Sequence, residues 1–274
     1  MPIFLAHLGP SGTYGEEAAV LHNPEARLFP LPSHLAVIEA VREGRANEGI
    51  VAIENSLNGP VVEVTDDLIH GTGVHVQGEV VVPVVHCLIV APGEPDIKII
   101  YSHPQALGQC RGFSQKCFPK AELAATLSTV AAVEKMLELP CSSAAIASAR
   151  AAELYGAEIL SRGIQDSKSN ETRFFVLALT DHSPTGDDKT SLCFSFGEDK
   201  PGQLVSVLEE FSKRGINLAR VESRPAKTEL GRYVFLVDLA GHREDLLVAE
   251  AICAAREKAT GIFKILGSYP RYQG

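Results

Sequence analysis

Four short polar segments border predicted strands in the first two thirds of the 274-residue chain. They are residues 9–15, 54–59, 102–105 and 170–173. Open α/β sheets bind their ligands at the carboxyl ends of the strands, so segments in such positions can converge on one cleft. Their polar side chains are mostly amides and hydroxyls, which donate hydrogen bonds well but are weak bases. Spacing alone therefore predicts a cleft for a small anion and names no reaction.

Residues 9–15 follow the first predicted strand and open a helix. The hydroxyls of Ser11 and Thr13 would join the backbone N–H groups of the helix N-terminus, an arrangement that suits an anion. A dinucleotide-binding fingerprint is disfavoured because Ser11 stands where that motif needs its second glycine. A simple strand-to-helix turn without a ligand is the alternative.

Asn55 and Ser56 come directly after the strand predicted at residues 49–53. Their side chains could donate hydrogen bonds to a carboxylate. Either residue could instead cap the helix expected near residues 62–69, and spacing does not separate the two roles.

Ser102 and His103 end another predicted strand, and Pro104 suits the first turn of the helix that carries Gln109. Ser102 and Gln109 would add polar groups to the same edge of the sheet. His103 could act as a general base at its usual pKa. A histidine at a strand-helix junction is more often structural, so both readings stay open.

Thr172 and Arg173 come just before the last strand of this part of the chain, predicted at residues 174–179. Arg173 could bind a carboxylate through two parallel hydrogen bonds. In so acidic a region it could equally form an ion pair with a neighbour such as Glu171. Thr172 offers a hydroxyl beside it.

Apolar runs alternate with amphipathic stretches up to residue 180, which predicts a mainly parallel sheet covered by helices. Helices are expected at residues 33–43 and 128–139, with Ser33 and Ser128 as N-caps. The expected strands are residues 3–8, 49–53, 80–90, 98–101, 123–127, 144–147 and 174–179.

A second domain is predicted after a linker. Residues 181–189 are rich in turn formers and charge, whereas residues 190–274 follow a βαββαβ order. This order is typical of a ferredoxin-like unit, whose sheet leaves one face open for pairing with a second copy. We therefore place the first domain at residues 1–180 and the second at 190–274.

Composition excludes several classes of protein. The net charge of -9 and the lack of a basic run give no support for nucleic-acid binding. The six cysteines include no closely spaced pair that indicates a zinc or redox site. The longest apolar run, residues 80–92, is too short and broken to span a membrane, and the first residues lack a secretory pattern. A cytoplasmic protein is expected.

The chain resembles the prephenate dehydratases from about residue 3 to residue 270. The segments containing Gly9-Pro10-Ser11-Gly12-Thr13, Ile53-Glu54-Asn55-Ser56, Ser102-His103-Pro104-Gln105 and Asn170-Glu171-Thr172-Arg173-Phe174 occur in that family's order. The C-terminal unit is similar to the family's ACT domain. Its two motifs are Gly202-Gln203-Leu204 and Glu222-Ser223-Arg224-Pro225. Two residues depart from the family pattern. Ala52 stands where Pro is usual, and Gln203 stands where Ala is usual.

The resemblance implies a two-lobed, periplasmic-binding-protein-like catalytic domain that turns prephenate into phenylpyruvate, carbon dioxide and water without a cofactor. Chain crossings between the lobes are expected near residues 75–80 and 155–165. Thr172 would donate a proton or hydrogen bond to the departing hydroxyl. Asn55, Ser102 and Gln109 would hold the ring, and the substrate's carboxylates would be bound by Ser11, Thr13, Ser56 and Arg173.

The resemblance also implies feedback regulation. The effector L-phenylalanine would bind between paired ACT domains of a homodimer or homotetramer. Its site would consist of Gly202, Gln203, Leu204, Glu222, Ser223, Arg224 and Pro225. The longer Gln203 puts the tightness of that site in question.

Three other functions remain open at this point. Arogenate dehydratase differs only in a substrate that carries an amine in place of the keto group. A non-catalytic small-anion-binding protein would share the two-lobed cleft, and an amino-acid-sensing regulator would share the C-terminal unit.

Overall fold

The computed structural model describes residues 3–93, 96–140, 142–198, 200–227, 229 and 231–273. The chain forms two compact units. One consists of residues 1–37, 50–61 and 81–174, and the other of residues 38–49, 62–80 and 175–274. Within the described ranges, no helix is long and apolar enough to cross a bilayer.

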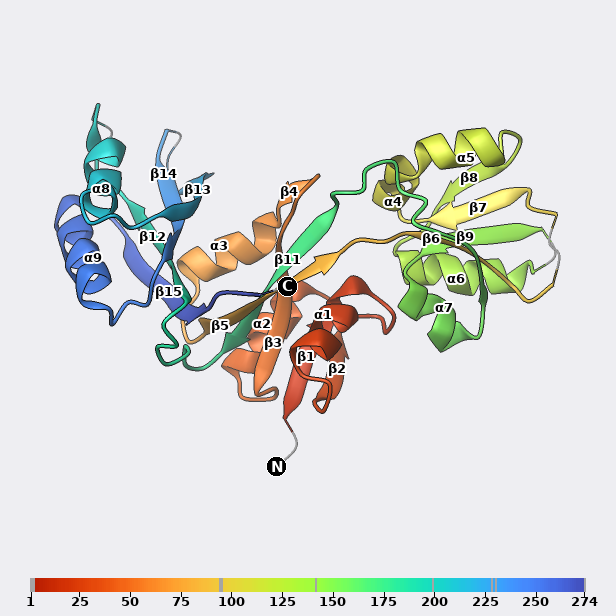
Figure 1. Cartoon of the computed structure of the whole chain (residues 1–274), viewed down its shortest axis with the longest axis horizontal. Coiled ribbons are helices and arrows are strands. Elements are labelled where there is room, and N and C mark those ends of the chain that lie inside the picture. The colour runs from red at the N-terminus through yellow and green to blue at the C-terminus, as the bar shows by residue number, and fades with distance from the viewer. Residues whose placement is uncertain are drawn as a thin grey trace. The chain divides into compact units, whose positions relative to one another are not determined.

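The first sheet has the strand order β2-β1-β3-β11-β5, with β4 paired to β3 (Figure 1). Its strands are β1 (Phe4–Leu8), β2 (Arg27–Leu31), β3 (Glu48–Asn55), β4 (Gly59–Pro60), β5 (His75–Pro83) and β11 (Glu171–Ala178). The helices of this part of the chain are α1 (Tyr14–His22), α2 (His34–Arg42) and α3 (Val62–His70). Sequence reasoning missed β2, whose Pro30 is tolerated because β2 lies at the sheet's edge.

The second sheet has the order β10-β6-β9-β7-β8. Its strands are β6 (Cys87–Val90), β7 (Ile99–Ser102), β8 (Glu122–Ala125), β9 (Ser143–Ala147) and β10 (Glu158–Arg162). Its helices are α4 (Pro104–Gln109), α5 (Arg111–Cys117), α6 (Thr129–Glu138) and α7 (Ala149–Tyr155). β7 pairs in parallel with β8 and β9, but β6 runs antiparallel to β9 and β10, so this sheet is mixed.

Helices cover both faces of the second sheet (Figure 1). Val133 and Met136 of α6 pack in one apolar cluster, and Ala106 and Cys110 lie in a separate one. The predicted N-cap Ser128 is confirmed, because its Oγ accepts the N–H of Ala131 at 2.9 Å.

The single strand expected at residues 80–90 is wrong. The chain leaves the first sheet after Pro83 and enters the second at Cys87. It returns between residues 163 and 170. The crossings thus lie a few residues beyond the expected 75–80 and 155–165. They are joined to each other, since the His86 carbonyl accepts the N–H of Gly163 at 3.0 Å.

The C-terminal sheet has the order β13-β14-β12-β15, with antiparallel pairs throughout the described register. Its elements are β12 (Asp188–Ser195), α8 (Gln203–Ser212), β13 (Leu218–Pro225), β14 (Tyr233–Ala240), α9 (Leu246–Lys258) and β15 (Phe263–Pro270). Val207 and Phe211 of α8 pack with Ala251 of α9 in its core. The predicted βαββαβ order is confirmed.

The segment before this sheet is hydrogen-bonded to it. The Asp188 carboxylate accepts the N–H groups of Thr185 at 2.8 Å and Gly186 at 3.0 Å. Asp181 accepts the N–H of Ser268 in β15 at 3.0 Å. Residues 181–187 are therefore attached to the C-terminal sheet, and β12 begins inside the range expected to be linker.

Candidate active site

The first unit contains a cavity of about 460 Å³. It is lined by residues from β3 and β11, from the starts of α1, α2, α4 and α6, and from the two chain crossings. Within the part of the chain that the structure describes, no Asp, Glu, Lys or Arg lines it. The cavity is thus polar through amides, hydroxyls and imidazoles instead of through charge.

Asn55, at the end of β3, is oriented by the backbone that follows it. Its Oδ1 accepts the N–H groups of Leu57 at 3.2 Å and Asn58 at 3.1 Å. The amide nitrogen must therefore face the other way. There it donates to Asn170 Oδ1 at 2.8 Å and Thr172 Oγ1 at 2.9 Å.

A series of side-chain hydrogen bonds continues from Asn55 through Asn170. Asn170, only 2% exposed, uses its own nitrogen to donate to Gln109 Oε1 at 2.9 Å. His86 Nε2 lies 2.8 Å from the same oxygen and so must be the donor of that pair. The Tyr14 hydroxyl is within 3.2 Å of His86 Nδ1.

Burial shifts the pKa of His86 and of Tyr14, the last two residues in this series of contacts. It lowers the pKa of His86, although the bond to Gln109 opposes the shift. It also raises the pKa of Tyr14 well above its usual value. A neutral His86 and a protonated Tyr14 are therefore the forms expected near neutral pH.

Thr172 is placed to donate. Its hydroxyl oxygen accepts the N–H of Asn55, and among the described residues no acceptor for its own proton is found. Thr172 and Phe174 both line the cavity, as alternate residues on one face of β11 do. The hydroxyl proton is thus available to a molecule in the cavity.

Arg173 is not brought into the cavity, because it lies between those two residues and faces the other side of β11. Its side chain is 11% exposed, and Nη1 lies 3.8 Å from Glu54 Oε1. Its surroundings therefore fit the ion-pair alternative, with Glu54 as a partner.

The segment at residues 9–15 already binds an anionic side chain of the protein itself, the carboxylate of Glu16. Glu16, 3% exposed, accepts the N–H of Gly12 at 3.1 Å and pairs with Arg150 of α7 at 3.3 Å. Thr13 lines the cavity, but its hydroxyl donates to the Leu8 carbonyl at 2.9 Å. Ser11 is exposed and does not line the cavity.

Two other expected residues hold the fold around the site. Ser102 is fully buried outside the cavity lining and donates to the Ile146 carbonyl at 2.6 Å. Ser56 is exposed and bridges to a chain crossing, since its hydroxyl donates to the Ser169 carbonyl at 2.9 Å. Of the eight residues expected to act on the substrate, the cavity thus gathers four, which are Thr172, Asn55, Gln109 and Thr13.

Sequence reasoning missed His34 and gave no role to Tyr14, His86 or Asn170, all of which line the cavity. The signal for His86 was its place as the one histidine in a long apolar run. His103 also lines the cavity, and its Nδ1 accepts the N–H of Gln105 at 3.3 Å. That bond uses the lone pair through which a neutral His103 would act as a base.

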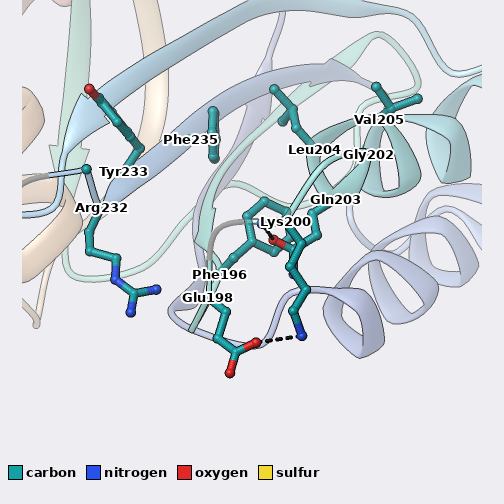
Figure 2. Close-up of a pocket in the computed structure, with 11 residues that line it drawn as sticks. Phe196, Glu198, Lys200, Gly202, Gln203, Leu204, Val205, Arg232, Tyr233 and Phe235 are labelled. Atoms are coloured by element: carbon teal, nitrogen blue, oxygen red, sulfur yellow. Dashed lines mark hydrogen bonds and ion pairs between the residues drawn. The ribbon is translucent and has the colours of Figure 1, made fainter.

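A smaller cavity of about 130 Å³ lies in the second unit, at the start of α8 (Figure 2). Gly202, Gln203 and Leu204 line it, together with Phe196, which follows β12, and two aromatic residues of β14. Gly202 has a φ of 85°, which glycine adopts without strain. Gln203 Oε1 accepts the N–H of Lys200 at 2.9 Å, so the side chain folds back over the turn.

The second effector motif lies elsewhere. Glu222, Ser223, Arg224 and Pro225 are on β13, the edge strand, and do not line this cavity. Arg224 Nη2 is 3.4 Å from Asp66 Oδ1 on α3.

No cluster of three or more His, Cys, Asp or Glu that could bind a metal ion occurs among the residues described. For an organic cofactor, the cavity likewise offers only the neutral groups above.

Residues 5–182 match the family model for prephenate dehydratase, and residues 191–257 match that for the ACT domain. A bifunctional chorismate mutase/prephenate dehydratase of Aquifex aeolicus is 41% identical over 271 residues, covering 98% of this chain and 74% of that protein. A crystal structure of prephenate dehydratase from Arthrobacter aurescens in complex with L-Phe is 34% identical with a TM-score of 0.90, covering 98% of this chain and 90% of that one. A structure described as a novel type of quorum quenching acylase is 31% identical with a TM-score of 0.89, covering 98% of both chains.

Proposed function

This chain belongs to the prephenate dehydratase family, and we propose that its larger cavity converts prephenate to phenylpyruvate, carbon dioxide and water. The observation that carries the proposal is the state of Thr172. Its oxygen accepts a hydrogen bond from Asn55, and the residue lines a cavity that, among the described residues, has no Asp, Glu, Lys or Arg in its lining. A group that must donate to a departing oxygen needs this arrangement.

The reaction breaks two bonds on one ring. The electron pair of the ring-carboxylate bond enters the ring as carbon dioxide leaves, and the bond to the ring hydroxyl breaks at the opposite carbon. The dianion thus becomes a monoanion, carbon dioxide and hydroxide, and the hydroxide becomes water by taking up one proton. Aromatisation supplies the driving force.

Thr172 supports the departing oxygen. A threonine is a weak acid, so its main contribution is a hydrogen bond that strengthens as negative charge develops on that oxygen. Asn55 and Gln109 hold this donor and the ring in place. Ser102 and Ser56 hold the surrounding backbone through their hydrogen bonds, and Arg173 supports β11 and β3 through Glu54.

The second domain carries feedback regulation by L-phenylalanine. The turn at Gly202, Gln203 and Leu204 forms a cavity on one copy. The motif that ends at Pro225 lies on an edge strand, where a second copy can add to it. We infer that each effector site takes the turn from one copy and β13 from its partner, in a dimer or a tetramer. In this proposal residues 1–180 form the catalytic domain and residues 190–274 the ACT domain.

The test is incubation of the purified protein with prephenate, following phenylpyruvate by its absorbance in alkali, with and without L-phenylalanine. Product that falls as L-phenylalanine is added supports the proposal. Parallel incubations with arogenate and with an acylase substrate address the two nearest alternatives. Absence of product from both prephenate and arogenate rules out the dehydratase function.

A further inference from the structure

The proposed substrate is a dianion, yet no Lys or Arg side chain lines the cavity in the ranges that the structure describes. Arg173, the expected carboxylate ligand, faces Glu54 outside it. The substrate's charge must therefore be met by helix N-termini and neutral donors, which bind anions through oriented N–H groups.

Three helices of nine or ten residues begin at the cavity, namely α1, α2 and α6. At the start of α1 the N–H of Gly12 already donates to Glu16. At the starts of α6 and α2, Ser128 and Ser33 cap the helices through their own side chains, which accept the N–H groups of Ala131 at 2.9 Å and Ala36 at 3.1 Å. The start of α2 differs because it carries His34 into the cavity lining.

His34 is an imidazole with a buried nitrogen that has no partner. The residue is 8% exposed, and its Nδ1 makes no hydrogen bond in the structure. The other cavity histidines, His86 and His103, each have ring nitrogens that are hydrogen-bonded. A buried polar atom without a partner costs folding free energy, so such a group in a residue that lines a cavity needs an explanation.

We propose that His34, together with the N-terminus of α2, binds the side-chain carboxylate of the substrate, the one that remains in phenylpyruvate. This inference rests on the proposed dehydratase function. Burial lowers the pKa of His34 to about 4, so its imidazole is a neutral N–H donor at neutral pH.

The choice between the substrate's two carboxylates follows from the chemistry. The ring carboxylate must leave as neutral carbon dioxide. Donors that bind it strongly would stabilise the ground state more than the transition state and slow the reaction. The side-chain carboxylate keeps its charge throughout, so it can be bound tightly without this penalty.

The experiment measures binding of phenylpyruvate by calorimetry to the full-length protein and to His34→Phe and His34→Gln. Phenylpyruvate retains only the side-chain carboxylate. Loss of one hydrogen bond to a charged group predicts an affinity about 10- to 100-fold weaker in His34→Phe. The KM for prephenate should rise by a similar factor while kcat changes little. His34→Gln keeps a donor and should recover much of the loss.

His75→Phe is the matched control, because His75 Nδ1 is also buried without a partner but lies in β5, outside the cavity lining. It should bind phenylpyruvate as the unmodified protein does. A measurement on the unmodified protein covers the case in which His34→Phe fails to fold. The imidazole ¹⁵N resonance of His34, identified by its loss in His34→Gln, should shift when phenylpyruvate is added.

Unchanged phenylpyruvate affinity in His34→Phe, or an unmoved His34 resonance, overturns the assignment. A raised KM for prephenate with normal phenylpyruvate affinity also overturns it, because His34 would then contact the ring carboxylate. Failure of the unmodified protein to convert prephenate is a different result and contradicts the proposed function itself.

Discussion

Asn55 Nδ2 lies 2.9 Å from Thr172 Oγ1, and the amide is the donor. The direction of this bond is set by the backbone, because Asn55 Oδ1 already accepts two N–H groups from the turn that follows it. An N–H directed at the threonine oxygen leaves the hydroxyl proton free for a group in the cavity. The polarity of this single bond thus decides whether Thr172 can donate to a leaving group.

Asn55→Asp tests that polarity. The carboxylate can still accept the N–H groups of Leu57 and Asn58, so the turn should survive. On its other side it becomes an acceptor, and Thr172 would donate its proton to it instead of to the substrate. We expect kcat for prephenate to fall about 100-fold or more in steady-state assays.

A control is needed because a new negative charge also repels a dianion. Leu127 lines the cavity but is 96% exposed, so Leu127→Asp adds charge at the rim without touching Asn55. It should raise KM and leave kcat nearly unchanged. If both variants behave alike, the orientation of Asn55 has no part in turnover.

Thr172→Val tests the donor itself. Valine matches threonine in shape and strand preference, so the fold should be kept while the hydroxyl is lost. Removing one donor of this kind typically lowers turnover about 10²- to 10³-fold. Thr172→Ser retains the hydroxyl and should keep most of the activity. Near-normal rates in the valine variant would place the donor elsewhere.

The positions of site residues at strand ends could be predicted from the sequence. Asn55 and Thr172 could be placed because one ends a strand and the other begins one, and the order of segments matched a known family. The same reasoning did not predict which group binds the turn at Gly12. Glu16 lies four residues further on and accepts the N–H of Gly12, so that N–H group already has an anionic partner.

The roles of His86 and Asn170 could not be predicted, because their partners are distant in sequence. His86 meets Gln109, 23 residues away, and Asn170 meets Asn55, 115 residues away. Periodicity reports which face of an element is buried, and it says nothing about such pairs. His34 was missed for another reason, since one polar residue at a helix start is common.

The stability of the protein should fall in acid partly because of His34. Its pKa drops from 6.5 to about 4 on folding. Between those pH values the unfolded chain binds a proton that the folded chain does not, so this contribution is complete above pH 6.5 and is lost as the pH falls towards 4. The shift corresponds to about 3 kcal/mol at most.

Urea unfolding of the unmodified protein and of His34→Gln at pH 7 and pH 4.5 measures this contribution to the free energy of unfolding. The variant should lose less stability between the two pH values. Burial also lowers the pKa of His7 and His86, but both proteins share those groups, so the difference isolates His34. Equal losses would show that His34 is not buried as a neutral group.

Ser223→Ala combined with Arg224→Ala should relieve inhibition by L-phenylalanine. We expect the concentration for half-inhibition to rise about tenfold, within the range of usual allosteric coupling. Unchanged inhibition would place the effector site outside this segment.

Asp66→Asn separates effector binding from its transmission. Arg224 of β13 and Lys227, two residues beyond its end, both pair with Asp66 of α3, at 3.4 Å and 2.5 Å. Burial raises the pKa of Asp66, but the hydrogen bond from Lys227 and the charge of Arg224 outweigh it and lower the pKa, so the carboxylate is ionised. The variant should bind L-phenylalanine in calorimetry much as before but show weaker maximal inhibition. Loss of binding instead would make Asp66 part of the effector site.

Gln203→Ala should tighten the effector site. The side chain lines a cavity of only about 130 Å³, and shortening it makes room for an aromatic ligand. The bond from the Lys200 N–H to Gln203 Oε1 would be lost, which costs about 1 kcal/mol of stability. Inhibition by L-phenylalanine should therefore occur at lower concentration, in a protein with a slightly lower Tm. Gln203→Met keeps the length and removes the amide. If it tightens inhibition as much as Gln203→Ala does, polarity and not space limits binding, and weaker inhibition in both would mean that the amide itself binds the effector.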